Sequence, residues 1–344
     1  MIELKNNSLI FSFSEVHPKA CLTIDFQRTL RIPDDDKNYP LPPGLGRFPM
    51  KHVDDYAKTV SPTWLEHGGV MLPMYQSEAL WLNFDSDFIE EHDATYPFVI
   101  KVVTGKINAV TGDDWTDWLQ RNPQDYMVST EQPWLDGYCI EKGFIRQFVA
   151  MPLGSGYSAE EQITGEAQHG GIQIVVYPMK REVFERRFPK IELRYKKIKM
   201  LYKMPLESSI AAEPDMALAP GGRMRQEIYE DPFDLNDWDM DHRSRCFVHI
   251  ANSLVWRAIT GEAPPTVPFT AKEYTKYGLP WFDYYADNAT ALEGAEKLKG
   301  LKSVNKLGEQ KGDNLLPENE SVNPENVVKL RSGLKKNQVR EENF

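Results

Sequence analysis

Hydrophobic residues in this chain occur in short runs that are interrupted by glycine, proline or charged residues. Runs of this kind, rich in Val, Ile, Phe and Tyr, are typical of β-strands. Two pairs of runs lie so close together in the sequence that they predict β-hairpins, and two further runs predict short strands near the start. The hairpins are expected at 96–104 with 106–110 and at 137–140 with 144–151, and the two short strands at 9–13 and 21–26. The apolar segment 68–84 has mixed periodicity, which favours a strand followed by a helix.

Signals for helices are fewer, and each predicts a short helix. Ser158 and Glu161 have the spacing of a capping box, in which the serine oxygen accepts an early helix amide and the glutamate reaches back to the cap, and Gly165 is expected to end that helix. Thr270 and Glu273 repeat the pattern. Hairpins with short helices favour an α+β fold rich in antiparallel sheet, because a parallel doubly wound fold would alternate its strands with long helices.

The chain divides into two parts by composition. Residues 1–300 carry the aromatic and apolar runs and predict a single globular domain. Residues 301–344 lack aromatic side chains except Phe344 and are rich in Asn, Glu, Lys and Gly, which is typical of a largely disordered tail. A short helix is predicted within that tail near residues 326–334.

Cysteine spacing, the length of the apolar runs and the net charge indicate where the protein is located and which partners are disfavoured. Three cysteines lie far apart without a CxxC pair, which excludes a disulfide framework and fits a reducing cytoplasm. No run approaches the roughly 20 apolar residues that span a bilayer, so a soluble cytoplasmic protein without membrane insertion is expected. The net charge of -11 disfavours nucleic acid as a general partner.

Charge is unevenly distributed along the chain. The stretch from Lys180 to Lys203 holds ten Lys or Arg residues, and the stretch from Glu213 to His242 holds nine Asp or Glu residues. Basic residues interleaved with aromatic ones can bind single-stranded nucleic acid, whereas neighbouring stretches of opposite charge can pair within the fold. The second interpretation is the simpler one, and both stay open at this point.

Four segments together suggest a family. They are RFPMKHVDDY, GGVMLPMYQSEALWLNF, EQPWLDGYCIEKG and RCFVHIANS. The chain resembles, over roughly its first 300 residues, a family of uncharacterised microbial proteins to which no activity is assigned. The resemblance therefore implies no catalytic residue and no substrate.

A glycine-rich loop between a predicted strand and a predicted helix is the first candidate site. Gly154, Gly156 and the helix start satisfy G-x-G-x-x-A, but the preceding strand is predicted to pair in a hairpin, which does not fit a dinucleotide-binding unit. Free amides at a helix start favour an anion, so Gly154, Ser155, Gly156 and Ser158 are expected to bind one, with Arg146 nearby. Glycines that merely permit a sharp turn are the alternative.

Glu166 and His169 form the second candidate site. Their E-x-x-H spacing would put a carboxylate and an imidazole on one face of a helix, where they could act as acid and base or as metal ligands. The adjacent glycines indicate that the helix has already ended, and a third ligand would have to come from Glu161, His67 or His249. No stoichiometric metal is therefore expected.

Two hypotheses about function follow. The first is a cytosolic binding or accessory protein that recognises an anionic small molecule or an acidic partner through Arg146 and the loop from Gly154 to Ser158. The second is a metal-assisted or acid/base hydrolase or transferase that uses Glu166 and His169. No motif assigns a cofactor or an oligomeric state.

Overall fold

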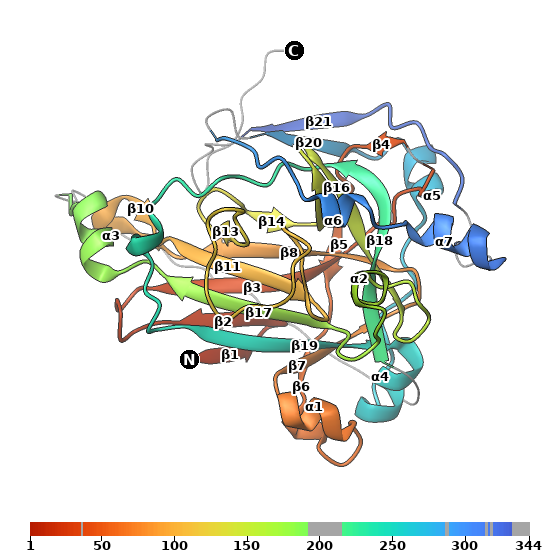
Figure 1. Cartoon of the computed structure of the whole chain (residues 1–344), viewed down its shortest axis with the longest axis horizontal. Coiled ribbons are helices and arrows are strands. Elements are labelled where there is room, and N and C mark those ends of the chain that lie inside the picture. Colours follow the sequence, from red (N-terminus) through yellow and green to blue (C-terminus); the bar gives the residue numbers. More distant parts are fainter. Residues whose placement is uncertain (36, 192–214, 286–288, 314–315, 317–318, 332–344) are drawn as a thin grey trace.

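The computed structural model of the chain describes residues 1–35, 37–191, 215–285, 289–313, 316 and 319–331 (Figure 1). Within them strands dominate, and the α-helices are only four to eight residues long. Most strand pairs are antiparallel. The α+β class with antiparallel sheet is therefore confirmed.

One half of the main sheet consists of strands that pair in antiparallel fashion with their neighbours. In spatial order they are β1 (Ile2–Lys5), β2 (Ser8–Ser12), β3 (Cys21–Thr29), β8 (Ala79–Ser86), β16 (Phe144–Pro152) and β18 (Asp215–Arg225).

The other half continues from the start of β18, where Asp215 and Met216 pair with β19. Its strands are β19 (Ser244–Asn252), β17 (Ile172–Pro178), β11 (Phe98–Thr104) and β13 (Met127–Val128) on one side, and β7 (Val70–Met74) on the other. The pairing of β7 with β19 is parallel, as is that of β18 with β4 (Asn38–Tyr39).

Shorter strands complete the sheets. Attached to the main sheet are β5 (Gly44–Arg47), β6 (Lys51–His52), β12 (Ile107–Asn108), β14 (Trp134–Leu135) and β15 (Gly137–Glu141). Two separate pairs are β9 (Phe88–Ile89) with β10 (Ala94–Thr95) and, in parallel, β20 (Trp281–Tyr285) with β21 (Val327–Arg331).

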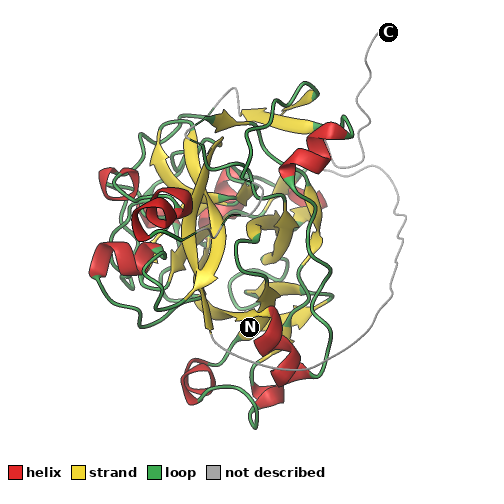
Figure 2. Ribbon diagram, turned by 90° about the vertical axis from the view of Figure 1, so that its right-hand side faces the viewer, coloured by secondary structure: helices red, strands yellow, loops and turns green. Residues whose placement is uncertain are grey.

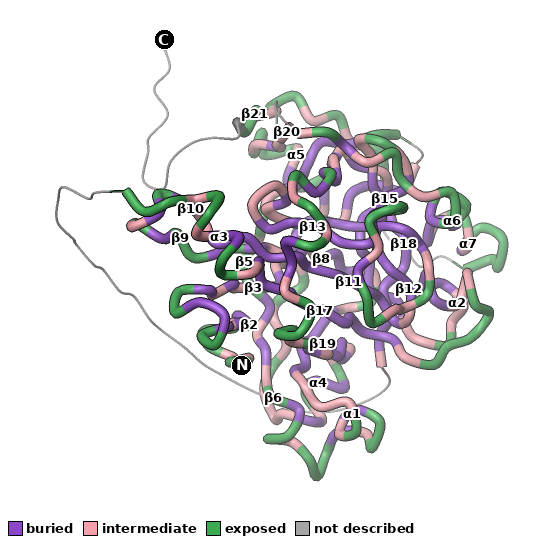
Figure 3. The backbone as a smooth tube through the Cα atoms, turned by 60° about the vertical axis from the view of Figure 1, so that its left-hand side comes forward, coloured by how far each residue is buried: buried purple, intermediate pink, exposed green. Residues whose placement is uncertain are grey.

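Both halves of the sheet contribute to one hydrophobic core. Ile24 and Leu82 from the first half share this cluster with Ile100 and Ile174 from the second, and all four are fully buried. The central strands are accordingly buried along their length, as the purple segments of Figure 3 show. Strand β11 is buried at every position, and its sequence is an apolar run interrupted by Lys101 rather than an alternating pattern.

The helices lie around the strands rather than between them (Figure 2). The α-helices are α1 (Pro62–His67), α2 (Ala159–Thr164), α3 (Arg181–Arg187), α4 (Ser253–Thr260), α5 (Ala271–Lys276), α6 (Glu296–Lys299) and α7 (Val304–Lys311). Single 3-10 turns occur at Asp54–Tyr56, Glu90–His92 and Leu235–Asp237. Both predicted capping boxes are confirmed, at Ser158 and at Thr270. No helix in the described part of the chain combines the length and hydrophobicity needed to cross a bilayer.

Two predicted elements are wrong. The helix expected in the second half of 68–84 is strand β8, because Leu80, Leu82 and Phe84 are buried on one face at a spacing of two, and β3 and β16 supply partners. Of the helix expected near 326–334, residues 327–331 form strand β21, whose pairing with β20 a local sequence pattern does not reveal, and residues 332–334 lie outside the described residues.

The described residues after 300 pack against the body. Leu301, Val304 and Leu316 are buried, and the last two share a hydrophobic cluster with Tyr157. This differs from the unstructured segment that composition suggested. Whether residues 1–300 fold as an independent domain stays a prediction, which a truncation tests below.

Candidate functional site

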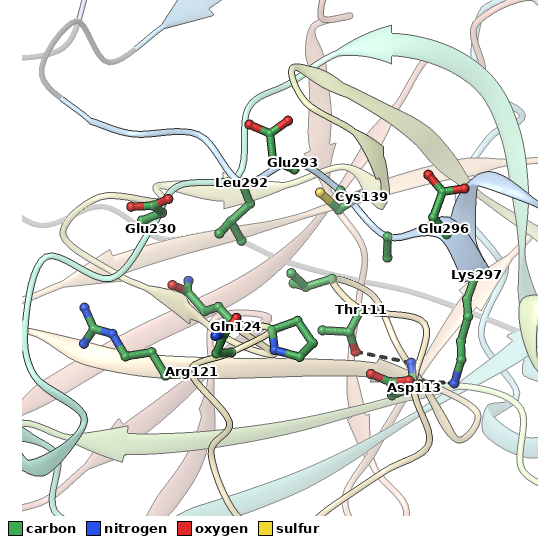
Figure 4. A pocket seen from close by; sticks show the side chains of 15 residues that line it. Thr111, Asp113, Arg121, Gln124, Cys139, Glu230, Leu292, Glu293, Glu296 and Lys297 are labelled. Carbon is green, nitrogen blue, oxygen red and sulfur yellow. Dashed lines mark hydrogen bonds and ion pairs between the residues drawn. The ribbon is translucent and has the colours of Figure 1, made fainter.

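An open cleft of about 510 Å³ lies between two segments that are distant in the sequence. One wall is the loop of residues 110–124, and the other is the segment 292–297 that leads into α6 (Figure 4). Cys139 on β15 and Glu230 line it as well. Neither candidate site of the sequence analysis lies in this cleft.

The cleft is lined by the buried polar residues Thr111 and Gln124 and by an apolar part, its floor. This floor is formed by Val110, Pro123, Cys139, Leu292 and Ala295. Burial raises the pKa of the Cys139 thiol to about 12, so the thiol stays protonated near neutral pH and is not a nucleophile. The floor therefore offers contact surface for an apolar body rather than reactive groups.

The loop wall is held by buried polar contacts. The side-chain oxygen of Asn108 accepts hydrogen bonds from the amides of Val110 and Thr111, at 2.8 and 3.1 Å, and its amide nitrogen donates to the carbonyl of Asp125 at 2.7 Å. Asp125 in turn pairs with the buried Lys101 at 2.6 Å. These contacts position the loop before any ligand arrives.

The opposite wall is fixed to strand β15. The amide of Ala295 donates to the carbonyl of Cys139 at 3.1 Å, and Gly294 has a φ of +82°. A Cβ on Gly294 would lie 2.4 Å from the Cα of Glu141, so only glycine permits this approach. The cleft is therefore largely preformed on both sides.

Carboxylates outnumber cations around the cleft. Four acidic residues line it (Asp113, Glu230, Glu293 and Glu296), against two basic ones (Arg121 and Lys297), as Figure 4 shows. Both cations have nearby carboxylates, since Lys297 pairs with Asp113 at 2.6 Å and Arg121 lies 3.7 Å from Asp231. Glu293 pairs with Lys142 at 2.5 Å. Among the described residues, the exposed Glu230 forms no ion pair and no side-chain hydrogen bond, although its charge also acts on Lys142, which pairs with Glu293.

The glycine-rich loop has the backbone that the sequence predicted, but its amides are already engaged. Glu161 accepts hydrogen bonds from the amide of Gly156 at 2.6 Å and from the amide and hydroxyl of Ser158 at 3.1 and 2.6 Å. Gly154 is exposed, and Ser155 uses its carbonyl to accept from Lys311. An external anion at this loop would have to displace the Glu161 carboxylate.

Arg146 is not close to that loop. It lies on β16, six positions before Pro152 at the end of the strand, or about 20 Å of extended chain. Its guanidinium donates to the carbonyl of Gly221 at 3.1 Å and lies 3.8 Å from the carboxylate of Asp34. The structure therefore separates Arg146 from the other residues of the predicted anion site.

Glu166 and His169 follow α2 rather than lying on it, because the helix ends at Gly165. Glu166 is exposed, and its carboxylate accepts a hydrogen bond from the side-chain amide of Gln168. The ring of His169 lies 6.4 Å from that of His67, and burial lowers the pKa of His169. The spacing thus does not put the two groups on one helical face.

Two of the three residues proposed as a third ligand do lie near His169. The rings of His67 and His249 are stacked with 6.2 Å between their centroids, and Nε2 of His249 lies 3.0 Å from the carbonyl oxygen of Gly68. Glu161 instead caps α2. In the part of the chain that the structure describes, no group of three or more His, Cys, Asp or Glu residues is arranged to hold a metal ion.

The basic and acidic stretches pair where both are described. Arg187 lies 2.5 Å from the carboxylate of Asp237, and Arg186 lies 3.8 Å from it. Arg187 is also 3.7 Å from Asp234. Residues 192–203 of the basic stretch and 213–214 of the acidic one lie outside the described residues.

The cleft could not be predicted from the sequence, because its lining comes from four separate parts of the chain. The only signal in the sequence was the overall excess of acidic residues, which does not say where they gather. Comparisons with protein-family models, with curated proteins and with solved structures find no match for this chain. The resemblance to an uncharacterised microbial family stays a prediction.

Proposed function

We propose that this protein is a binding protein and that its ligand site is the acidic cleft between residues 110–124 and 292–297. The ligand class is a small aliphatic molecule that carries one or more ammonium groups. The proposal keeps the binding role expected from the sequence but assigns it to a different place and to a ligand of opposite charge.

The observation that carries the proposal is the exposed carboxylate of Glu230, which lines a preformed cleft and forms no ion pair with another described residue. Arg121 and Lys297 each have a carboxylate nearby within the protein, so the remaining acidic groups leave a negative potential at the mouth. Such a potential attracts a cation and repels an anion.

The apolar floor defines the body of the ligand. Val110, Pro123 and Leu292 offer contacts to a methylene chain, while the carboxylates stand at the rim. A molecule with ammonium groups joined by methylenes satisfies both surfaces at once. A fully polar cation, such as a hydrated metal ion, would leave the floor unused.

The two hypotheses from the sequence stay as alternatives. Binding of an anion at the loop from Gly154 to Ser158 requires release of Glu161. A hydrolase or transferase built on Glu166 and His169 requires a third group that approaches both. A cytoplasmic location also stays a prediction.

Probes of equal length and different charge test the ligand class. Cadaverine, pentanediol and glutarate each have five carbons and end in ammonium, hydroxyl and carboxylate groups respectively. Isothermal titration at low ionic strength should give binding for cadaverine alone, and the affinity should fall as salt is added because the attraction is screened. Binding of glutarate in preference to cadaverine would contradict the proposal and favour the anion hypothesis.

A further inference from the structure

A second cavity, of about 190 Å³, lies on a different part of the molecule and has different walls. Trp81 on β8, Trp134 on β14 and Phe282 on β20 line it, together with the segment Leu41 to Gly44 and Leu330 on β21. Asp136 is the one ionisable residue in its lining.

The aromatic walls are held in place by the sheet. Trp134 pairs with Asn83 of β8, and its ring lies 6.3 Å from that of Trp81 in an edge-to-face arrangement. On its other side Trp134 contacts Tyr284, with 4.7 Å between ring centroids. Trp81, Trp134 and Phe282 are all half-buried, so part of each ring is open to solvent or ligand.

Asp136 is 3% exposed, and no Lys, Arg or His among the described residues forms an ion pair with it. Its carboxylate accepts a hydrogen bond from the amide of Gln226 at 2.7 Å, and its backbone amide donates to the same Gln226 side chain at 3.0 Å. Buried carboxylates normally have a positive partner, because an isolated charge is costly in an apolar environment. The protein supplies hydrogen bonds here but no counter-charge.

We propose that this aromatic pocket binds a small organic cation of the quaternary or tertiary ammonium class, with Asp136 as its counter-charge and Trp81 and Trp134 as its walls. Aromatic faces attract such cations electrostatically and tolerate their methyl groups. The site is independent of the cleft, whose rim carboxylates are exposed and whose floor is aliphatic.

The electrostatics of Asp136 predict how this binding depends on pH. Burial raises the pKa of Asp136 to about 7, with a partial offset from the hydrogen bonds of Gln226 and Trp134. A cation binds the ionised carboxylate, so affinity should increase between pH 6 and pH 8, and a proton should be released on binding at the lower pH.

Tetramethylammonium is the probe, because it has no hydrogen-bond donor for the rim of the cleft and fits aromatic walls. Its binding is measured by titration calorimetry and by tryptophan fluorescence at pH 8, with tert-butanol as the neutral compound of similar shape. The variants are Asp136→Asn, which removes the charge without changing size, and Glu230→Gln, which alters only the cleft. Circular dichroism and thermal unfolding check that both variants fold.

Tetramethylammonium should bind the wild type and Glu230→Gln equally, and Asp136→Asn about tenfold or more weakly. Tert-butanol should bind none of them. The affinity for cadaverine should respond in the reverse way: Glu230→Gln should weaken it, and Asp136→Asn should leave it unchanged. Failure of one proposed site is therefore distinguishable from failure of the other. Equal affinity of the wild type and a folded Asp136→Asn for tetramethylammonium, or no binding to the wild type, would overturn the inference.

Discussion

His249 shows how burial changes the chemistry of a single residue. It lies on β19, is 5% exposed and stacks on Trp64 with 4.7 Å between ring centroids. Burial lowers the pKa of His249 to about 4, partly offset by the hydrogen bond with Gly68. The fold therefore favours the neutral ring, which fits a packed core position better than a catalytic base.

This shift makes stability depend on pH in a defined direction. The folded pKa lies below the unfolded value of about 6.5, so the neutral ring contributes its full share of the unfolding free energy above that pH and loses it as pH falls towards 4. Between pH 7 and pH 4.5, which is still above the folded pKa, the wild type should lose about 2 kcal/mol more than His249→Gln.

Urea unfolding at pH 7 and at pH 4.5 measures the difference. His52→Gln, which changes an exposed histidine on β6, is the control and should keep the wild-type response. Equal losses for the wild type and His249→Gln would show that the ring titrates normally in the folded protein.

At the scale of elements, prediction from the sequence succeeded where the signal is local. The two hairpins follow from β-rich runs joined by Gly105 or by residues 141–143, and both capping boxes from a spacing of three residues. The predictions of helices at β8 and β21 were wrong because the partner strands are remote in the sequence. The cleft could not be predicted for the same reason, since no stretch of sequence contains both of its walls.

The Glu161 carboxylate occupies the amides of the loop from Gly154 to Ser158, and a substitution can test whether it keeps anions out. Removing its side chain in Glu161→Ala frees the amides of Gly156 and Ser158 and should cost about 1 kcal/mol of stability through loss of the capping box. Added phosphate should then raise the melting temperature of Glu161→Ala more than that of the wild type.

Differential scanning fluorimetry in phosphate and in chloride at equal ionic strength makes this comparison. Glu166→Ala, an exposed change outside the capping box, serves as the control. A larger phosphate effect on the wild type than on Glu161→Ala would instead support an anion site at this loop.

For the whole molecule, the segment after residue 300 decides where the folded unit ends. Val304 and Leu316 are buried with Tyr157, the hydroxyl of Tyr157 donates to Asp313 at 2.8 Å, and β21 pairs with β20. A low aromatic content indicated a tail, but a few apolar residues suffice to attach a segment to an existing core.

A chain that ends at Lys306 should therefore be less stable than the full chain by about 3 kcal/mol or more, because Leu316 and strand β21 are lost. Leu316→Ala in the full chain should also lower the free energy of unfolding, by about 2 kcal/mol. Thermal and urea unfolding of the three proteins provide the values. An unchanged melting temperature on truncation would restore the interpretation of this segment as a dispensable tail.

The proposed cleft site binds an ammonium group through the carboxylate of Glu230, which has no ion-pair partner among the described residues. The most direct test is the affinity for cadaverine of the wild type, Glu230→Gln and the matched control Glu66→Gln, measured by calorimetry at one low salt concentration. Glu66 is an exposed residue of α1, outside the cleft. We expect Glu230→Gln to bind cadaverine about fivefold more weakly than the wild type, and Glu66→Gln to bind it like the wild type. Equal affinities for all three proteins would contradict this expectation.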